Sequence, residues 1–192
     1  MARADNLYAL PAGLPAPVDD GGASHLEGMA MPPVKLPSTA GRIVDVSELR
    51  GRTVLYCYPR TGRPDKDPPP GWDEIPGARG CTPQACSFRD HYQELKSVGA
   101  RVFGLSTQDP DYQREAAVRL HLPFELLSDA RLELTNALRL PVFQFEGVTL
   151  MRRLTLLLRD ADIEKVFYPV FPPDQSADEV LDWLRNHGRA VL

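Results

Sequence analysis

A near-continuous apolar run at residues 53–58 restricts the fold more than any other segment of this chain. Such a run is typical of a strand buried on both faces of a sheet. Further strands are expected at residues 42–46, 101–106, 122–127, 154–158 and 163–168, the last two joined as a hairpin. Apolar residues at three- and four-residue steps predict helices at residues 82–98, 111–121, 129–138 and from 176 onward.

The alternation of these strands and helices along the chain predicts an α/β fold with a central mixed sheet flanked by helices on both faces. The last helix is expected to start at Ser176 with a capping box that ends at Glu179. Residues 1–33 are rich in Pro, Gly and small residues without a period, which predicts an irregular N-terminal extension, on the surface or partly disordered. Residues 34–192 are long enough for one domain with its own core.

A long interruption separates the strand at 53–58 from the helix at 82. It contains a Pro-Pro-Pro-Gly run at residues 68–71 and further prolines at 64 and 76, which no helix or central strand accepts. Such a long irregular segment inside a compact domain is usually functional. Trp72 and Ile75 are expected to hold it against the body of the protein.

The net charge of −4 gives no support to nucleic acid or an anionic membrane as a partner. No run approaches the roughly 18 apolar residues of a membrane span. Residues 1–18 lack the pattern of a secretory signal, so a cytoplasmic location is expected.

Three cysteines, Cys57, Cys81 and Cys86, are too few for a structural disulfide framework. A zinc site is also disfavoured, because there is no second cysteine pair and the histidines are scattered singly. Thiol chemistry and inert core cysteines both stay open at this point. Cys57 lies in the apolar run and is expected to pack in the core.

Cys81 lies where the Pro/Gly-rich segment meets a predicted helix N-terminus, which favours an anion such as a thiolate. The helix dipole contributes only about 0.3–1 kcal/mol, so a cation must assist. Arg79 and Arg89 are the nearest candidates in sequence. The simpler interpretations are a solvated loop charge for Arg79 and a surface ion pair with Asp90 for Arg89.

Cys86 follows five residues after Cys81, within the same predicted helix. In an intact helix such residues have Cα atoms about 8.6 Å apart, whereas a disulfide requires less than about 7 Å. A bond between them therefore requires the helix turn to unwind. This argues against a structural disulfide and allows a transient one.

The stretch at residues 80–90, Gly-Cys-Thr-Pro-Gln-Ala-Cys-Ser-Phe-Arg-Asp, resembles the active-site stretch of the Q-type peroxiredoxins, or bacterioferritin comigratory proteins. The resemblance continues in the same order through residues 36–58, 103–107, 122–129 and 153–158. It covers about residues 32–186, so the chain resembles this family over most of its length.

The resemblance implies a thioredoxin-like fold and a thiol-dependent peroxidase that reduces hydrogen peroxide and organic hydroperoxides. Cys81 would attack the peroxide and become a sulfenic acid, Arg153 would complete the site, and Cys86 would close a disulfide with Cys81. Thioredoxin or a glutaredoxin-like protein would then reduce the disulfide. No metal, flavin or haem cofactor is implied, and a monomer or weak homodimer is expected.

The chain departs from the family pattern Pro-x-x-x-Thr/Ser-x-x-Cys in two ways. Pro59 precedes Cys81 by 22 positions, an apparent insertion of 15 residues at about 60–78, and Ala78 stands where the hydroxyl residue is expected. Thr61 is our first hypothesis for the hydroxyl that holds the peroxide, and Thr82 is the second. Tyr58 and Pro59 are interpreted as walls of the pocket.

Two other functions stay open from the sequence alone. A thioredoxin-like disulfide oxidoreductase would favour Cys-x-x-Cys, whereas this chain has four residues between Cys81 and Cys86. A redox sensor or holdase without turnover stays open because the usual hydroxyl before Cys81 is missing.

Overall fold

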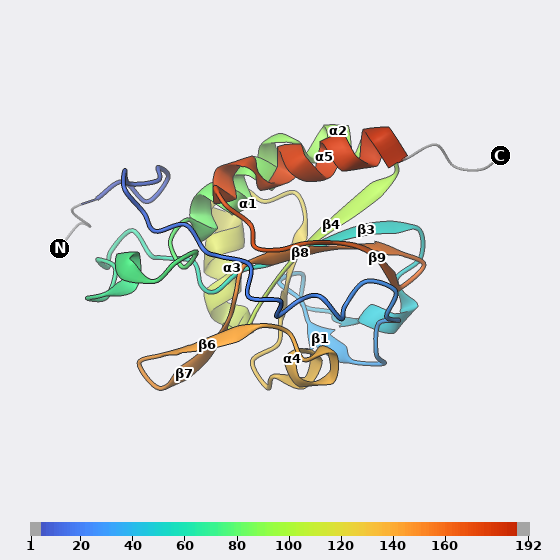
Figure 1. Ribbon diagram of the computed structural model, residues 1–192, viewed down its shortest axis with the longest axis horizontal. Helices are drawn as coiled ribbons and strands as arrows, with labels where there is room; N and C mark the ends of the chain where they lie inside the picture. Colours follow the sequence, from blue (N-terminus) through green and yellow to red (C-terminus); the bar gives the residue numbers. More distant parts are fainter. Residues whose placement is uncertain (1–4, 188–192) are drawn as a thin grey trace.

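The computed structural model describes residues 5–187 and contains one central sheet of five strands, in the order β5-β4-β3-β8-β9 (Figure 1). β3 pairs in parallel with β4 and antiparallel with β8, so the sheet is mixed. Its strands are β3 (Arg52–Cys57), β4 (Ala100–Ser106), β5 (Glu125–Ser128), β8 (Leu154–Arg159) and β9 (Asp162–Phe167). The predicted buried run at 53–58 is thus confirmed as the middle strand of the sheet.

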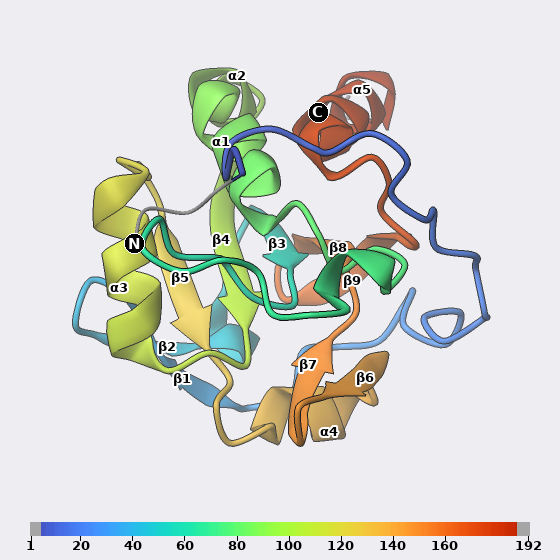
Figure 2. The same ribbon diagram turned by 90° about the vertical axis from the view of Figure 1, so that its left-hand side faces the viewer.

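Helices cover both faces of the sheet, as predicted. On one face pack α1 (Cys81–Asp90), α2 (Tyr92–Ser97) and α5 (Ser176–His187) (Figure 1). On the other lie α4 (Glu133–Leu138) and the small sheet formed by β1 (Lys35–Pro37) and β2 (Ile43–Asp45). The helix α3 (Pro110–Arg119) lies beside the edge strand β5 (Figure 2).

The hairpin predicted from residues 154–168 is confirmed as β8 and β9, turned through Asp160 and Ala161, both at positive φ. A second hairpin was not predicted. It consists of β6 (Val142–Phe145) and β7 (Val148–Met151), and its turn places Glu146 and Gly147 at positive φ. Its strands are short and mostly exposed or half-buried, so they lack the strong apolar pattern that reveals a core strand.

Three predicted helices differ in their limits, and the smallest difference is at α3, which spans Pro110–Arg119 instead of residues 111–121. The helix expected at 82–98 is interrupted at His91, because the Ser87 carbonyl is shared between the backbone N–H and the ring Nδ1 of His91. The helix expected from Asp129 starts at Glu133, since the Asp129 carboxylate accepts hydrogen bonds from the backbone N–H groups of residues 134 and 135.

The last helix begins at Ser176 as predicted, but the capping box is wrong. Ser176 already has helical backbone angles (φ −60°, ψ −37°), so it lies inside the helix rather than before it. Its hydroxyl instead accepts a hydrogen bond from Gln84 Nε2 in α1 at 3.3 Å.

The N-terminal extension is irregular and lies mostly on the surface, as predicted, but a few of its apolar side chains are buried in the core. Leu26 and Met31 are buried in the same core as β3 and β8, and Ala30 bridges to Asp162. Such burial could not be predicted from the sequence, because these apolar residues are isolated and follow neither a helical nor a strand period. Residues 1–4 and 188–192, which the predicted extension and domain include, lie outside the described residues.

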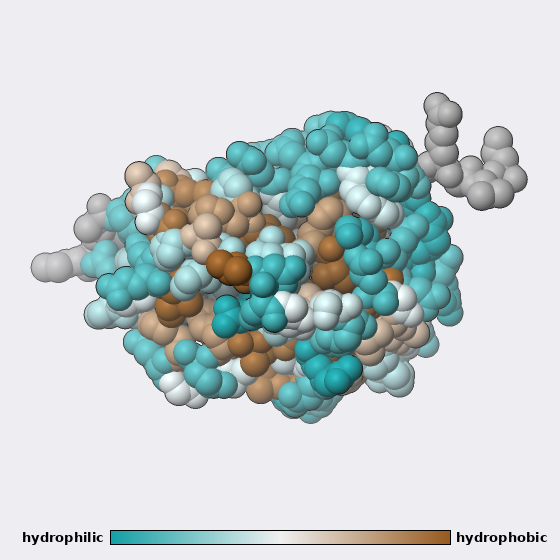
Figure 3. Space-filling model, viewed as in Figure 1, coloured by the Kyte–Doolittle hydropathy of each residue, from teal (hydrophilic) through white to brown (hydrophobic). Residues whose placement is uncertain are grey.

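The inserted segment packs against the β6–β7 hairpin through Trp72, which is 5% exposed and meets the Phe145 ring edge-on at 5.1 Å. Ile75 packs on the same cluster, which confirms that these two residues hold the segment to the body. On the face shown in Figure 3, hydrophobic residues lie interspersed among hydrophilic ones. No helix among residues 5–187 is both long enough and apolar enough to span a bilayer.

Candidate active site

Cys81 is the first residue of α1, and its side chain is buried. It follows Gly80, whose φ of 104° suits glycine. A Cβ at Gly80 would also lie 2.4 Å from Pro173 and 2.7 Å from Leu10, so a larger residue would displace both neighbours. No side chain caps this end of the helix, which leaves its first N–H groups available to an anion.

Arg153 lies between β7 and β8, and its guanidinium reaches the Cys81 sulfur. The Nη2 atom is 3.2 Å from Sγ, and the side chain is only 3% exposed. Its neighbour Arg152 faces outward, 3.8 Å from Asp20, so the two arginines point to opposite sides. A positive guanidinium at this distance stabilises a thiolate on Cys81.

The remaining donors of Arg153 bind neutral acceptors that fix its position. Nη2 and Nε donate to the carbonyls of Gly77, Ala78 and Arg79 at 3.2–3.3 Å, and Nη1 donates to Gln84 Oε1. Within residues 5–187, no carboxylate forms a salt bridge with Arg153. The thiolate of Cys81 is therefore the natural counter-charge of this cation.

Gln84 is a positioning residue that sequence reasoning missed. It is fully buried and links Arg153 to Ser176 of α5 through its two amide atoms. A signal was available, because Gln84 stands three residues after Cys81 and so lies on the same face of the helix.

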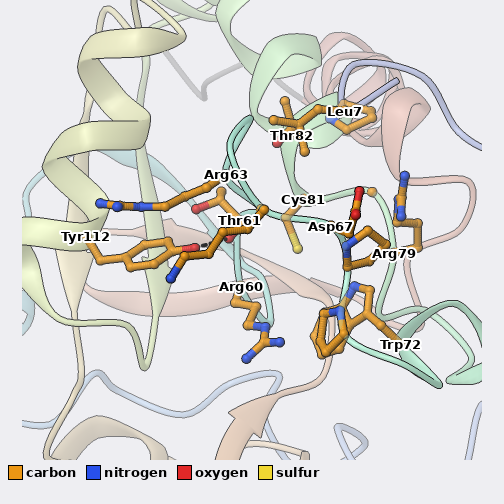
Figure 4. Close-up of a pocket in the computed structure, with 16 residues that line it drawn as sticks. Leu7, Arg60, Thr61, Arg63, Asp67, Trp72, Arg79, Cys81, Thr82 and Tyr112 are labelled. Atoms are coloured by element: carbon orange, nitrogen blue, oxygen red, sulfur yellow. Dashed lines mark hydrogen bonds between the residues drawn. The ribbon is translucent and has the colours of Figure 1, made fainter. Parts of the chain in front are cut away.

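A cavity of about 310 Å³ opens beside Cys81 (Figure 4). Thr61 and Thr82, the two predicted hydroxyl donors, both line it. The inserted segment contributes much of the wall, together with Leu7 of the N-terminal segment, which the sequence did not indicate. The lining residues are Leu7, Arg60, Thr61, Gly62, Arg63, Lys66, Asp67, Pro68, Pro69, Trp72, Arg79, Gly80, Cys81, Thr82, Pro83 and Tyr112.

The two threonines differ in their partners. The Thr61 backbone N–H and hydroxyl both donate to Gln108 Oε1, at 2.9 and 3.3 Å, and the Tyr112 hydroxyl donates to the Thr61 carbonyl at 3.1 Å. The Thr82 hydroxyl is buried without a partner in the described part of the chain. In Figure 4 the Cys81 sulfur points away from Thr82.

Tyr58 and Pro59 do not line the cavity, so the prediction that they form its wall is wrong. Both are buried at the end of β3, where Tyr58 packs in the same apolar cluster as Cys81 and receives a hydrogen bond from Gln113 Nε2 at 3.3 Å. Burial raises the pKa of the Tyr58 phenol well above its ordinary value. Tyr58 therefore belongs to the core around Cys81 and not to the cavity.

Neither arginine near Cys81 in sequence is the cation at its sulfur. Arg79 is not the solvated charge that was expected, because it is 7% exposed and forms ion pairs with Asp73, at 2.9 Å, and with Asp5. Those partners, one in the insertion and one in the N-terminal segment, could not be identified from spacing. Arg89 does pair with Asp90, at 2.8 Å, as predicted.

The other two cysteines occupy different environments. Cys57 is fully buried in β3, and burial raises the pKa of its thiol, which confirms its place in the core. Cys86 is half-buried within α1, and burial raises the pKa of its thiol while Arg89 opposes this effect. All three cysteines are free, and within residues 5–187 no cluster of His, Cys, Asp or Glu could hold a metal ion.

Comparisons with known proteins identify the family. The Redoxin family matches residues 26–181. The chain is 30% identical over 186 residues to chloroplastic peroxiredoxin Q of Gentiana triflora, covering 94% of this chain and 78% of the relative. It is 32% identical over 165 residues to chloroplastic peroxiredoxin Q of Sedum lineare, covering 85% and 80%.

Solved structures agree with these relatives. The crystal structure of peroxidoxin BcpB from Mycobacterium tuberculosis superposes with a TM-score of 0.68 at 27% identity, covering 83% of this chain and 96% of that one. Xanthomonas campestris peroxiredoxin Q, at 22% identity, shares the fold with a TM-score of 0.66 and coverage of 81% and 92%. The chain therefore belongs to the Q-type peroxiredoxins of the Redoxin family and is a thiol-dependent peroxidase.

Proposed function

We propose that Cys81 is the thiol that attacks the hydroperoxide, with Arg153 as the cation that stabilises its charge. The observation that carries this proposal is the 3.2 Å contact between Arg153 Nη2 and the Cys81 sulfur at the uncapped start of α1. Among residues 5–187, Cys57 has no such partner, and Cys86 lies about a turn and a half further along the helix.

In the first step the Cys81 thiolate attacks the terminal oxygen of the hydroperoxide. An S–O bond forms as the O–O bond breaks, so sulfur is oxidised to a sulfenic acid and the peroxide is reduced. The alkoxide, or hydroxide from hydrogen peroxide, leaves and takes a proton from water to become an alcohol or water. Arg153 and the N–H groups at the start of α1 stabilise the negative charge as it moves from sulfur to oxygen.

Thr61 supplies the hydroxyl that the family pattern places three residues before the cysteine. While it donates to Gln108, its oxygen keeps lone pairs with which to accept the hydrogen bond of the peroxide O–H. This bond would direct the terminal oxygen toward the Cys81 sulfur.

Cys86 completes the cycle as the resolving thiol. It attacks the Cys81 sulfenic acid, an S–S bond forms, the S–O bond breaks and water leaves. Since both cysteines belong to the intact helix α1, this step requires its first turns to unwind. Burial raises the pKa of the Cys86 thiol in the folded helix, and unwinding would remove that burial.

An external dithiol then reduces the disulfide and is itself oxidised to a disulfide. The family implies a thioredoxin-like reductant. We propose thioredoxin or a glutaredoxin-like protein in this role, acting on a monomer or weak homodimer.

Replacing Arg153 tests the proposed cation. Arg153→Met should slow single-turnover oxidation of Cys81 by hydrogen peroxide about ten- to hundredfold, since a hydrogen bond to a charged group contributes about 1.5–3 kcal/mol. Stopped-flow measurements should show a smaller decrease in the oxidation rate for Arg153→Lys, which keeps the positive charge but not the planar set of N–H donors. Arg152→Met, which removes the outward-facing neighbour, is the matched control and should react at the wild-type rate. A wild-type rate in Arg153→Met would contradict the assignment.

Replacing the cysteines separates the two steps. Cys81→Ser should abolish peroxide consumption, because a serine hydroxyl provides no comparable anion. Cys86→Ser should complete one turnover and then stop, and mass spectrometry should find one added oxygen on Cys81. Cys57→Ala should keep full cycling. Sustained thioredoxin-dependent turnover by Cys86→Ser would show that another thiol resolves the sulfenic acid.

A comparison of the two threonines tests the proposed hydroxyl. Thr61→Val should slow Cys81 oxidation by about ten- to hundredfold through loss of its hydrogen bond to the peroxide. Thr82→Val, an equal change on the other side of the sulfur, should slow it less. The reverse order of the two rates would assign the hydroxyl to Thr82.

A further inference from the structure

The cavity beside Cys81 is larger than hydrogen peroxide requires. Its volume of about 310 Å³ compares with about 30 Å³ for a water molecule in the liquid, and it reaches the lower range of pockets for small organic ligands, about 300–1,000 Å³. The inserted segment and Leu7 build its outer wall, so this space is a feature of the present chain. The cavity therefore has room for the organic part of a hydroperoxide.

Positive charge gathers in this cavity although the chain as a whole carries a net charge of −4. Four basic residues line it, against one acidic residue, Asp67, among those described. Two of the four are already compensated: Arg79 by its two aspartates, and Arg60 by Glu146 at 3.7 Å. Lys66 likewise has an interaction partner.

Arg63 is the basic residue whose charge is left without a carboxylate in the described part of the chain. It is half-buried, and its guanidinium lies over the Tyr112 ring at 4.9 Å from the ring centre. Its Nε atom is buried and has no hydrogen-bond partner among residues 5–187. Nearby Arg119, in contrast, binds Glu115 at 2.7 Å and the Gly62 carbonyl at 3.0 Å.

A guanidinium that lines a cavity without a carboxylate partner favours a ligand that brings a negative charge. A carboxylate is the best match, because the planar guanidinium donates to both of its oxygens. In Figure 4, Arg63 and Tyr112 lie on the opposite side of the cavity from Trp72 and Arg79. Apolar side chains complete the lining and suit a hydrocarbon body: Leu7, Pro68, Pro69, Trp72 and Pro83.

We infer that the cavity selects organic hydroperoxides that carry a carboxylate, with Arg63 binding the carboxylate while the peroxide group reaches Cys81. This inference rests on the proposed role of Cys81, and the reaction is the one balanced above. The alcohol product keeps its carboxylate, which takes no part in the chemistry.

Two probes of nearly equal shape test this inference: cumene hydroperoxide and its para-carboxylate analogue. Single-turnover oxidation of Cys81 should be about tenfold faster with the carboxylate, the size expected of a charge-assisted hydrogen bond. In Arg63→Gln the ratio of the two rates should fall to about one or two. Arg63→Lys keeps the charge and should give an intermediate ratio.

Arg131→Gln is the matched control, because it makes the same charge change at a side chain that is 78% exposed and pairs with Glu133. It should keep the wild-type ratio. Because each ratio is measured within one variant, partial loss of active protein does not alter it.

Equal rates for both probes in the wild type, or a ratio that Arg63→Gln leaves unchanged, would overturn the inference. If neither probe nor hydrogen peroxide oxidises Cys81, the proposed function fails instead. Oxidation by hydrogen peroxide in the same preparations therefore distinguishes the two failures.

Discussion

Arg153 is a buried cation, and the rest of the site depends on how its charge is satisfied. A charge in this position is costly unless hydrogen bonds and an opposite charge compensate it. Three carbonyls of residues 77–79 and the Gln84 amide supply hydrogen bonds, but only the Cys81 sulfur can supply a full negative charge. The same contacts tie the end of the insertion, the start of α1 and the start of β8 together, so the arginine both organises the site and favours its reactive form.

The insertion builds the surroundings of this arrangement of charge. Trp72 anchors it on the β6–β7 hairpin, and Arg79 anchors its end through Asp73. The chain therefore returns to Cys81 with fixed geometry, and the part of the insertion before Trp72 lines the cavity with arginines and prolines. The insertion thus bears on the choice of peroxide, while the cysteine and Arg153 bear on the chemistry.

The sequence was sufficient to predict those elements whose burial and periodicity depend on neighbouring residues. The buried strand β3, the β8–β9 hairpin and the helix that begins at Cys81 could be predicted because burial and periodicity are recorded in consecutive residues. Contacts between segments that are distant in the sequence could not be predicted in this way. The pairing of Arg79 with Asp5, the burial of Leu26 and the support of Arg153 by Gln84 join residues that only the folded chain brings together.

One short helix holds both Cys81 and Cys86, and we propose that it must open for the catalytic cycle to proceed. Hydrogen exchange followed by mass spectrometry tests this most directly, with reduced protein compared to protein oxidised by one equivalent of peroxide. Peptides that cover residues 82–90 should lose protection on oxidation, while residues 176–187 of α5 serve as an internal reference. Unchanged protection at residues 82–90 in protein shown to contain the Cys81–Cys86 disulfide would contradict the account.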